Sequence, residues 1–468
     1  METFADLIAC EDVLMFVNAA ITSTGQREFH SDDGAQRLSL DFLHHYMREN
    51  YRDLYAATLA LNINDHNAAL IVRRLLESGL RRPVEGRLIA RRLALLPPQR
   101  VYGMFRELRK AKVNNRTTRA IMRDWLAARP DPAFDAVKYR GAVRAAARHA
   151  HLTLDGELGP FLFAPRSRKV FATPLFDTWR RAHYEAGAVY ALPYTVAEGF
   201  AAKHGIDRGA FLERIAPRLT RLERLRLQES ARERKTTGLD RDLTGMPLTR
   251  LASYVLGLSL DDRARRRTEL TAALRDAARR AAGRQAGTWG RVTAVLDDSF
   301  SAFGSVVKRR RPLAVALACH HLLQVLAGEY RGLWLSGRGD DLLLYPYGPT
   351  PLGERIMDAL ETGPDRLVIV SDGWDNAPPG LAGEVLRIWR TRLDPAGRVG
   401  IVHLNPVYDA ADFDVRRLSP SVPTAGIRDA EDLPALVELA QFAEGRTGLP
   451  ELEAHLAERV GAFLERDS

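Results

Sequence analysis

The chain has 468 residues, 46% of them hydrophobic, which suits two or three globular domains with substantial cores. It contains no apolar run of membrane-spanning length, and its amino terminus lacks the basic stretch of a signal peptide. The two cysteines, Cys10 and Cys319, argue against a disulfide framework or a cysteine-based zinc site. We therefore expect a cytoplasmic protein without membrane segments, and a monomer.

The net charge of +9 hides a strong asymmetry along the chain. Residues 1–290 contain 49 Lys/Arg and 33 Asp/Glu, a balance of +16, whereas residues 291–468 contain 19 and 26, a balance of −7. A basic region favours phosphate-rich partners, because neutralising phosphates releases counterions. The alternative is an arginine-rich genome that places arginine on solvated helix faces.

The first 280 residues predict helices throughout, with short connections. Apolar residues at helical spacing, a glycine at Gly79 and prolines at Pro83 and Pro97 indicate where these helices begin and end. The predicted helices cover residues 68–79, 88–96, 100–112, 116–128 and 132–149. Such spacing predicts stacked antiparallel hairpins of the HEAT type, although no clean sequence repeat is present.

Two segments are candidates for connections between domains. Gln228–Thr244 is rich in charge and could be a linker or a mobile loop, and Gly283–Gly290 has the composition of a domain junction. We therefore predict an all-α domain over residues 1–283 and a second domain over residues 290–468.

The second domain alternates short buried strands with helices. Strands are predicted at 291–296, 331–335, 366–371 and 398–404, and helices near 311–327, 351–360, 381–393, 431–443 and 451–465. This alternation predicts a doubly wound, Rossmann-like parallel sheet with helices on both faces.

Oxygen-bearing side chains gather at the carboxyl ends of two predicted strands and in one loop. Asp297, Ser299 and Ser301 follow the first strand, Asp372 follows the third, and Thr350 precedes a helix. Ligands of open parallel sheets bind at this edge, and such donors suit Mg²⁺ or Mn²⁺. Taken singly, each aspartate could instead be a helix cap or turn residue.

This three-loop pattern resembles the metal-ion-dependent adhesion site (MIDAS) of von Willebrand factor A domains. The resemblance implies that Asp297, Ser299, Ser301 and Thr350 hold the ion directly or through water, and that Asp372 acts through a bridging water. It also implies an open coordination position for an acidic group of a protein partner. The ion then serves binding, not chemistry, so we expect no enzymatic activity.

A basic helical region before such a domain resembles the layout of the Ro, or TROVE-domain, RNA-binding proteins. The segments similar to that family's landmarks are Asp12–Gly25, Val137–Arg140, Arg148–His151 and Gly245–Leu251. The stretch around Tyr194 lacks the family's Trp-Glu signature. The resemblance implies helical repeats closed into a ring, with single-stranded RNA ends inside and structured small non-coding RNA across the outer face.

The same resemblance implies that six residues bind RNA. They are Lys138, Arg140, Arg144, Arg148, His149 and His151. Arginine and histidine can both hydrogen-bond phosphate and stack on bases. The alternative is that these side chains are simply the solvated face of a helix.

The sequence is compatible with two functions. The first is a Ro-like RNA-binding scaffold whose acidic second domain recruits an acidic protein partner through the ion. The second is an adaptor of a bacterial AAA+ ATPase, chaperone or conflict system that binds no RNA. Co-purifying RNA and salt-sensitive affinity would distinguish the first from the second.

Overall fold

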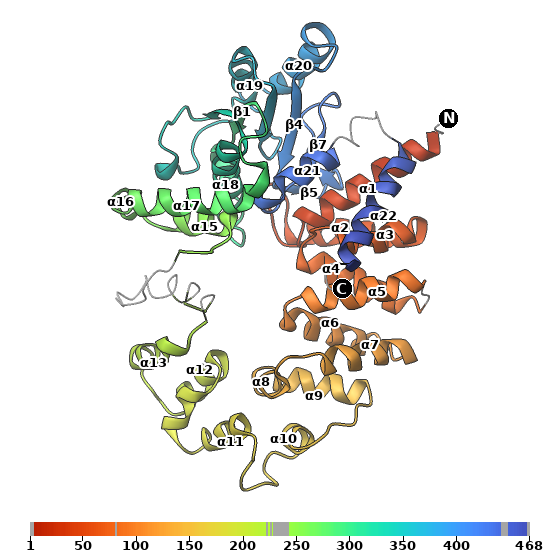
Figure 1. Cartoon of the computed structure of the whole chain (residues 1–468), viewed down its shortest axis with the longest axis vertical. Helices are drawn as coiled ribbons and strands as arrows, with labels where there is room; N and C mark the ends of the chain where they lie inside the picture. Colours follow the sequence, from red (N-terminus) through yellow and green to blue (C-terminus); the bar gives the residue numbers. More distant parts are fainter. Residues whose placement is uncertain are drawn as a thin grey trace. The chain divides into compact units, whose positions relative to one another are not determined.

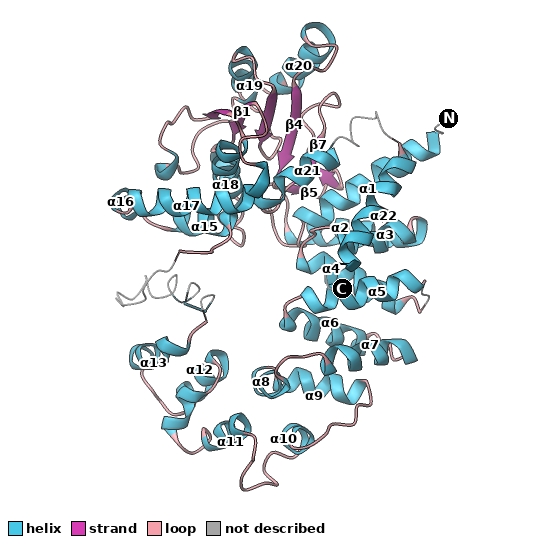
Figure 2. Ribbon diagram, viewed as in Figure 1, coloured by secondary structure: helices cyan, strands magenta, loops and turns pink. Residues whose placement is uncertain are grey.

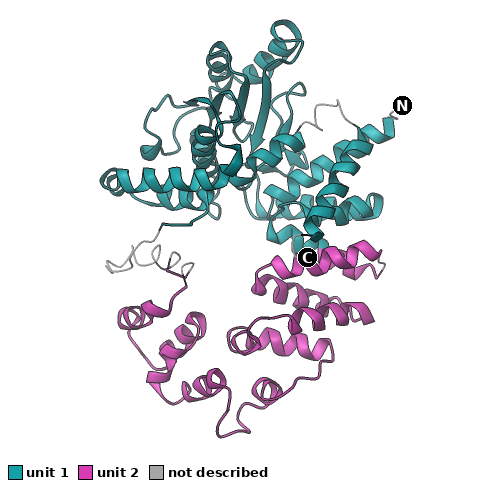
Figure 3. Cartoon of the chain, viewed as in Figure 1, with its two compact units in different colours: residues 1–71, 243–468 teal, residues 72–242 magenta. Residues whose placement is uncertain are grey.

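The computed structural model describes residues 4–79, 82–220, 223–224, 227, 243–440 and 448–465. It divides the chain into two compact units (Figure 3): unit 1 comprises residues 1–71 and 243–468, and unit 2 comprises residues 72–242. These units differ from the predicted ranges 1–283 and 290–468, because the first helix and the helices after residue 243 pack with the sheet domain.

Unit 1 contains a five-stranded parallel sheet flanked by helices (Figures 1 and 2). Its strand order is β2-β1-β3-β4-β7. Its strands are β1 (Arg291–Leu296), β2 (Glu329–Trp334), β3 (Arg366–Val370), β4 (Gly400–Asn405) and β7 (Thr424–Gly426). All four predicted strands are present within two residues, and the α/β class is confirmed. Strand β7 was missed because three residues carry no periodic signal.

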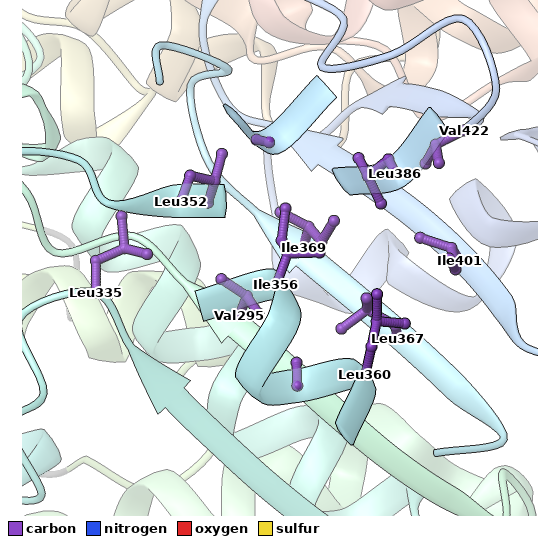
Figure 4. Packing of buried hydrophobic residues seen from close by; sticks show 12 residues of the cluster. Val295, Leu335, Leu352, Ile356, Leu360, Leu367, Ile369, Leu386, Ile401 and Val422 are labelled. Carbon is purple, nitrogen blue, oxygen red and sulfur yellow. The ribbon is translucent and has the colours of Figure 1, made fainter. Parts of the chain in front are cut away.

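The central strands are buried because their side chains are apolar on both faces, as parallel strands require. Val295 of β1 and Leu367 and Ile369 of β3 pack with Ile356 and Leu360 of helix α19 (Leu352–Glu361), as Figure 4 shows. Full burial of one such side chain contributes roughly 2 kcal/mol, so this core holds the strand ends rigidly.

Besides α19, the described part of the sheet domain includes α18 (Arg311–Leu326), α20 (Leu381–Ile388) and α21 (Leu433–Ala440). Helix α22 (Leu449–Glu465) instead packs against the amino-terminal helices α1 (Phe4–Thr22) and α3 (Arg52–Ala57). Helix α20 continues as a π-helical turn, Trp389–Leu393, which together match the predicted helix 381–393. Helix α18 packs against β1 and β2 and also against α15 (Leu248–Gly257) and α17 (Arg267–Ala282). Contact on both sides explains why α18 is apolar around its whole circumference. The short helix α16 (Leu260–Arg265) connects α15 to α17.

The amino-terminal helices of unit 1 are α1 (Phe4–Thr22), α2 (Asp33–Asn50) and α3 (Arg52–Ala57). Helix α1 packs against β7 and against the small hairpin β5 (Tyr408–Asp409) and β6 (Asp414–Val415). The Asn18 side chain donates to the Asp414 carboxylate at 2.9 Å and accepts from the Gly426 backbone N–H at 2.8 Å. A Cβ on Gly426 would lie 3.0 Å from the Asn18 carbonyl oxygen, so this close approach requires glycine.

Unit 2 consists of short helices, and α4 (Asp65–Glu77) runs from unit 1 into it. Its other described α-helices are α5 (Pro83–Leu95), α6 (Pro98–Lys110), α7 (Arg116–Ala127), α8 (Pro132–Lys138), α9 (Arg140–His149), α10 (Leu158–Phe163), α11 (Pro174–Arg181), α12 (Tyr194–Lys203) and α13 (Arg208–Ile215). Helices α5 and α7, and α6 and α9, pack in pairs, as expected for helical repeats. As predicted, Gly79 follows α4 in a left-handed conformation.

The predicted continuous helix 132–149 is wrong. It is two helices, α8 and α9, separated at Tyr139, whose φ of −116° and ψ of 29° are not helical. The Tyr139 ring packs against Tyr102 with ring centroids 5.3 Å apart. This tertiary contact has no counterpart in the helical periodicity from which the single helix was predicted.

Some sequence predictions fall outside the described residues. These are most of the charged segment Gln228–Thr244, of which 228–242 are not described, and residues 441–443 of the predicted helix 431–443. Within the described ranges, no helix is both long and apolar enough to cross a membrane.

Candidate functional site

The predicted metal ligands lie at one edge of the sheet. Asp297 directly follows β1, Asp372 lies two residues after β3, and the two strands are parallel neighbours. Their carboxyl ends therefore meet, which brings the two carboxylates together. Ser299 and Ser301 follow Asp297 in the same loop. Thr350 lies in the loop before α19. A backbone hydrogen bond joins these two loops, because the Phe300 N–H donates to the Gly348 carbonyl at 3.0 Å.

Hydrogen bonds hold each of these side chains in place. The Asp297 carboxylate accepts from the Ser299 backbone N–H at 2.9 Å and from the Ser371 hydroxyl at 3.0 Å. The Ser299 and Ser301 hydroxyl oxygens are 3.2 Å apart. Asp372 accepts from the Trp374 backbone N–H at 3.0 Å. The site is thus preorganised by contacts within its own loops.

The site carries more negative charge than the protein neutralises. Asp297 and Asp372 are only 5% and 4% exposed, and no lysine or arginine of the described residues forms an ion pair with either one. Burial first, and the charge of Asp372 second, raise the pKa of the Asp297 carboxyl to about 7. A bound cation would offset both effects.

The donor set fits a hard divalent cation. Two carboxylates and three hydroxyls offer only oxygen, which Mg²⁺ and Mn²⁺ prefer. The part of the chain that the structure describes has no group of three or more His, Cys, Asp or Glu side chains placed to hold a metal. A site of two carboxylates and three hydroxyls does not need such a group.

Three supporting residues were missed by sequence reasoning. Ser371 donates to Asp297, Asn376 accepts from the Thr350 backbone N–H at 2.8 Å, and the Asn405 amide donates to the Asp372 carbonyl at 3.0 Å. Ser371 and Asn405 lie at the carboxyl ends of β3 and β4, so the rule that found the aspartates could have found them. Asn376 carried no such signal.

A neighbouring aspartate has a different role. Asp298 is fully buried, and its carboxylate accepts hydrogen bonds from the backbone N–H and the hydroxyl of Ser336, which follows β2. Asp298 thereby connects the ends of β1 and β2. Asp298 therefore has a structural role, distinct from the metal-binding role predicted for Asp297.

A distant segment also reaches the site. The His30 ring stacks on the Trp374 ring at 4.3 Å, and its Nε2 lies 3.6 Å from an Asp372 carboxylate oxygen. His30 lies in the connection between α1 and α2, more than 300 residues away in the chain. No pattern in the sequence linked this histidine to the metal motif.

The predicted RNA-binding residues lie at the end of α8, along α9 and just beyond it, all in unit 2. Arg140, Arg144 and Arg148 are spaced by four residues, so they share one helix face. Arg140 is engaged structurally: its guanidinium donates to the Phe161 and Leu162 carbonyls at 3.0 Å and lies over two aromatic rings. Burial lowers the pKa of Arg140.

The other five residues differ in how free they are. Lys138 pairs with Glu223 at 3.7 Å, and Arg148 lies over the Phe163 ring at 5.1 Å. The His149 Nε2 lies 2.9 Å from the Val113 carbonyl oxygen, and the exposed His151 lies near Asn114. Arg144 is half-buried and forms no hydrogen bond or ion pair among the described residues. Arg144, Arg148 and His151 are therefore the most available.

Unit 2 also has a cleft of about 690 Å³ between α7, α9 and the chain that follows α9. Arg116, Arg119 and Arg123 of α7 line it, above an apolar floor that includes Val143 and Ala147. Of the six predicted RNA-binding residues, His151 is the one that lines this cleft. Sequence reasoning did not single out the α7 arginines.

Comparisons with known proteins rest on structure alone. The chain matches no protein-family model and no curated protein sequence. Its structure is similar to the crystal structure of the Deinococcus radiodurans Ro (RSR) protein, with a TM-score of 0.53 and 16% sequence identity. The match covers 93% of this chain and 100% of that one. The chain therefore has the fold of a Ro protein, helical repeats combined with a von Willebrand factor A-like domain.

Proposed function

We propose that the protein is a non-enzymatic Ro-like scaffold that binds RNA through its basic helices. The observation that carries this proposal is the likeness to a Ro protein across nearly the whole chain, together with the basic charge of residues 1–290. The proposed RNA is a small non-coding RNA or a single-stranded 3′ end. Arg144, Arg148 and His151 are the proposed contacts, because their side chains are the least engaged by the protein.

The test is the salt dependence of RNA binding. A fluorescein-labelled single-stranded RNA of about 20 nucleotides is titrated with the protein at several salt concentrations, and anisotropy is measured. The wild-type affinity is expected to fall steeply with salt. The double variant Arg144→Ala/Arg148→Ala should lower the slope by roughly 0.7 for each phosphate that it no longer neutralises.

The matched control removes two arginines from the other unit. Arg387 and Arg398 are exposed residues of unit 1, so the Arg387→Ala/Arg398→Ala variant keeps the same net charge as the double variant. An equal loss of RNA affinity in both variants would show that RNA responds to the net charge of the protein and not to a specific site on α9. Absence of RNA binding at low salt, with a protein partner co-purifying instead, would favour the AAA+ adaptor.

The proposal assigns a second binding activity to the sheet edge. Asp297, Ser299, Ser301 and Thr350 would hold Mg²⁺ or Mn²⁺, with Asp372 acting through water, and the ion would attract an acidic group of a protein partner. Support comes from two buried carboxylates without a lysine or arginine partner in the described residues. Mg²⁺ should therefore raise the unfolding temperature, since an ion that binds only the folded state stabilises it.

A further inference from the structure

The connection between α1 and α2 packs against the loops that carry the proposed metal ligands. The Phe29 ring contacts the Phe300 ring, edge to face, at a centroid distance of 5.9 Å. The next residue, His30, stacks on Trp374 and approaches the Asp372 carboxylate. Two consecutive side chains therefore touch two of the three loops that form the site. Both the segment and the site belong to unit 1.

A buried ion pair anchors this segment. Glu28 is 3% exposed, and its carboxylate pairs with the ammonium group of Lys308, which is 8% exposed. The segment is also closed on itself, because the Glu28 backbone N–H donates to the Ser31 carbonyl at 3.0 Å. Residues 28–31 therefore form a turn, and the Glu28–Lys308 ion pair holds this turn against the loop that follows Ser301.

The ligands below this turn are not open to another protein. Asp297, Ser299, Thr350 and Asp372 are all 5% exposed or less. A carboxylate carried by a second protein needs a path to the ion, and the Phe29 and His30 side chains contact two of the loops that carry the proposed ligands. Phe300, Val306 and Val307 are well exposed, which gives an apolar rim beside the turn.

We propose that residues 28–31 are an intramolecular occupant of the partner-binding face, and that an acidic peptide segment of a partner binds by displacing them. This inference rests on the proposed metal site and on its proposed acidic partner. Displacement would free Lys308 from Glu28 and uncover Trp374, over which the Arg416 guanidinium lies at 3.9 Å. The uncovered face would thus present a cation, a lysine and an arginine, which is complementary to acidic side chains.

The turn makes the affinity for an acidic partner depend on the population of the open form. A ligand that binds only the open form has an apparent affinity reduced by the fraction of molecules that are open. If less than about a tenth of the molecules are open, removing the covering side chains should tighten binding about tenfold or more. The intrinsic affinity for the ion should change little, because the five ligands remain.

The test uses His30→Ala and Phe29→Ala in the full chain, with His45→Ala as the matched control. His45 is an exposed histidine of α2 that the structure places in contact with Arg48 of the same helix. Mn²⁺ affinity is measured by calorimetry, and binding of a fluorescein-labelled hexaglutamate peptide by anisotropy, with and without Mn²⁺. Hydrogen exchange of residues 24–31 is followed as the peptide is added.

The expected result is an approximately tenfold gain in Mn²⁺-dependent peptide affinity in both variants, with Mn²⁺ affinity within about twofold of wild type. In the wild type, the peptide should accelerate exchange in residues 24–31. Equal peptide affinity in wild type, variants and control would overturn the covering role and leave the metal site standing. A roughly tenfold loss of Mn²⁺ affinity in His30→Ala would also overturn it, because His30 would then belong to the ligand set.

The proposed metal function fails in a different way. If wild type and Asp297→Ala bind Mn²⁺ equally weakly, there is no site for the turn to cover. If Mn²⁺ binds but the peptide binds neither wild type nor the uncovered variants, the acidic partner is the wrong ligand. The results therefore distinguish three failures: of the metal site, of the acidic partner, and of the covering role of residues 28–31.

Discussion

The sheet edge of unit 1 and helix α9 of unit 2 both carry the residues that sequence patterns singled out, yet the structure treats them differently. At the sheet edge, Asp297, Ser299 and Asp372 converge, are buried and are held by hydrogen bonds from their own loops. Along α9, Arg140 is part of the packing, whereas Arg144 stays available.

The difference reflects how each position is determined. The carboxyl ends of adjacent parallel strands must meet, so a motif placed there has one spatial outcome. A basic residue on a helix can point to solvent, stack on a ring or bond to a carbonyl, and the sequence around it does not decide which. Four substitutions test this difference between the two regions.

Asp297→Asn should have the largest effect, a loss of Mg²⁺ affinity of about 100-fold or more, because a direct carboxylate donor is removed. Without Mg²⁺, the variant should be as stable as wild type or about 1 kcal/mol more stable, since the repulsion between two buried carboxylates is relieved. Calorimetry and urea unfolding measure the two effects. Asp298→Asn is the control, and it should lower stability while retaining Mg²⁺ binding.

The next largest effect is expected in acid, because unit 1 contains His320, a histidine whose side chain is only 15% exposed. Burial first, and neighbouring His321 second, lower the pKa of His320 to about 4. The unfolded chain takes up this proton near pH 6.5, so stability is lost as pH falls from about 6.5 to 4. His320→Gln should remove about 3 kcal/mol of that loss between about pH 7 and 4 in urea unfolding. Parallel curves for variant and wild type would contradict it.

Arg140→Ala should lower the stability of unit 2 by about 2 kcal/mol, because it removes two charge-assisted hydrogen bonds to backbone carbonyls and the stacking of the guanidinium on two rings. Arg144→Ala, four residues on, should change stability by less than about 0.5 kcal/mol. Hydrogen exchange in α9 and α10 reports the change locally. Equal stabilities of the two variants would remove the distinction between packed and available arginines on α9.

Asn376→Ala should have the smallest effect, about a tenfold loss of Mg²⁺ affinity, because the Thr350 backbone loses its support while Thr350 itself remains. Calorimetry at fixed salt measures it. Thr350→Ser serves as the reference, since it keeps a hydroxyl at the same place. An affinity equal to that of wild type would show that Thr350 needs no second support.

Several features could be predicted because short-range patterns carry them. The apolar runs that became β1, β3 and β4 and the glycine after α4 were found, and the fold class was confirmed. The break at Tyr139 was missed, because the Tyr102 ring that it packs against lies in a different helix. Ring closure, the monomeric state and the cytoplasmic location stay predictions.

The apolar runs at residues 291–296 and 366–371 were enough to predict that Asp297 and Asp372 follow parallel strands, because a buried strand gives a short, local signal. Which side chains pack against those donors, and which basic residues stay free of protein contacts, depends on long-range packing that the sequence patterns did not reveal. The turn at Glu28–Ser31 reaches Trp374 and Lys308 because α1 packs on β7, an arrangement fixed by Asn18 and Gly426, which lie 408 residues apart in the chain. Contacts of that range have no local periodicity, so no local pattern encodes them.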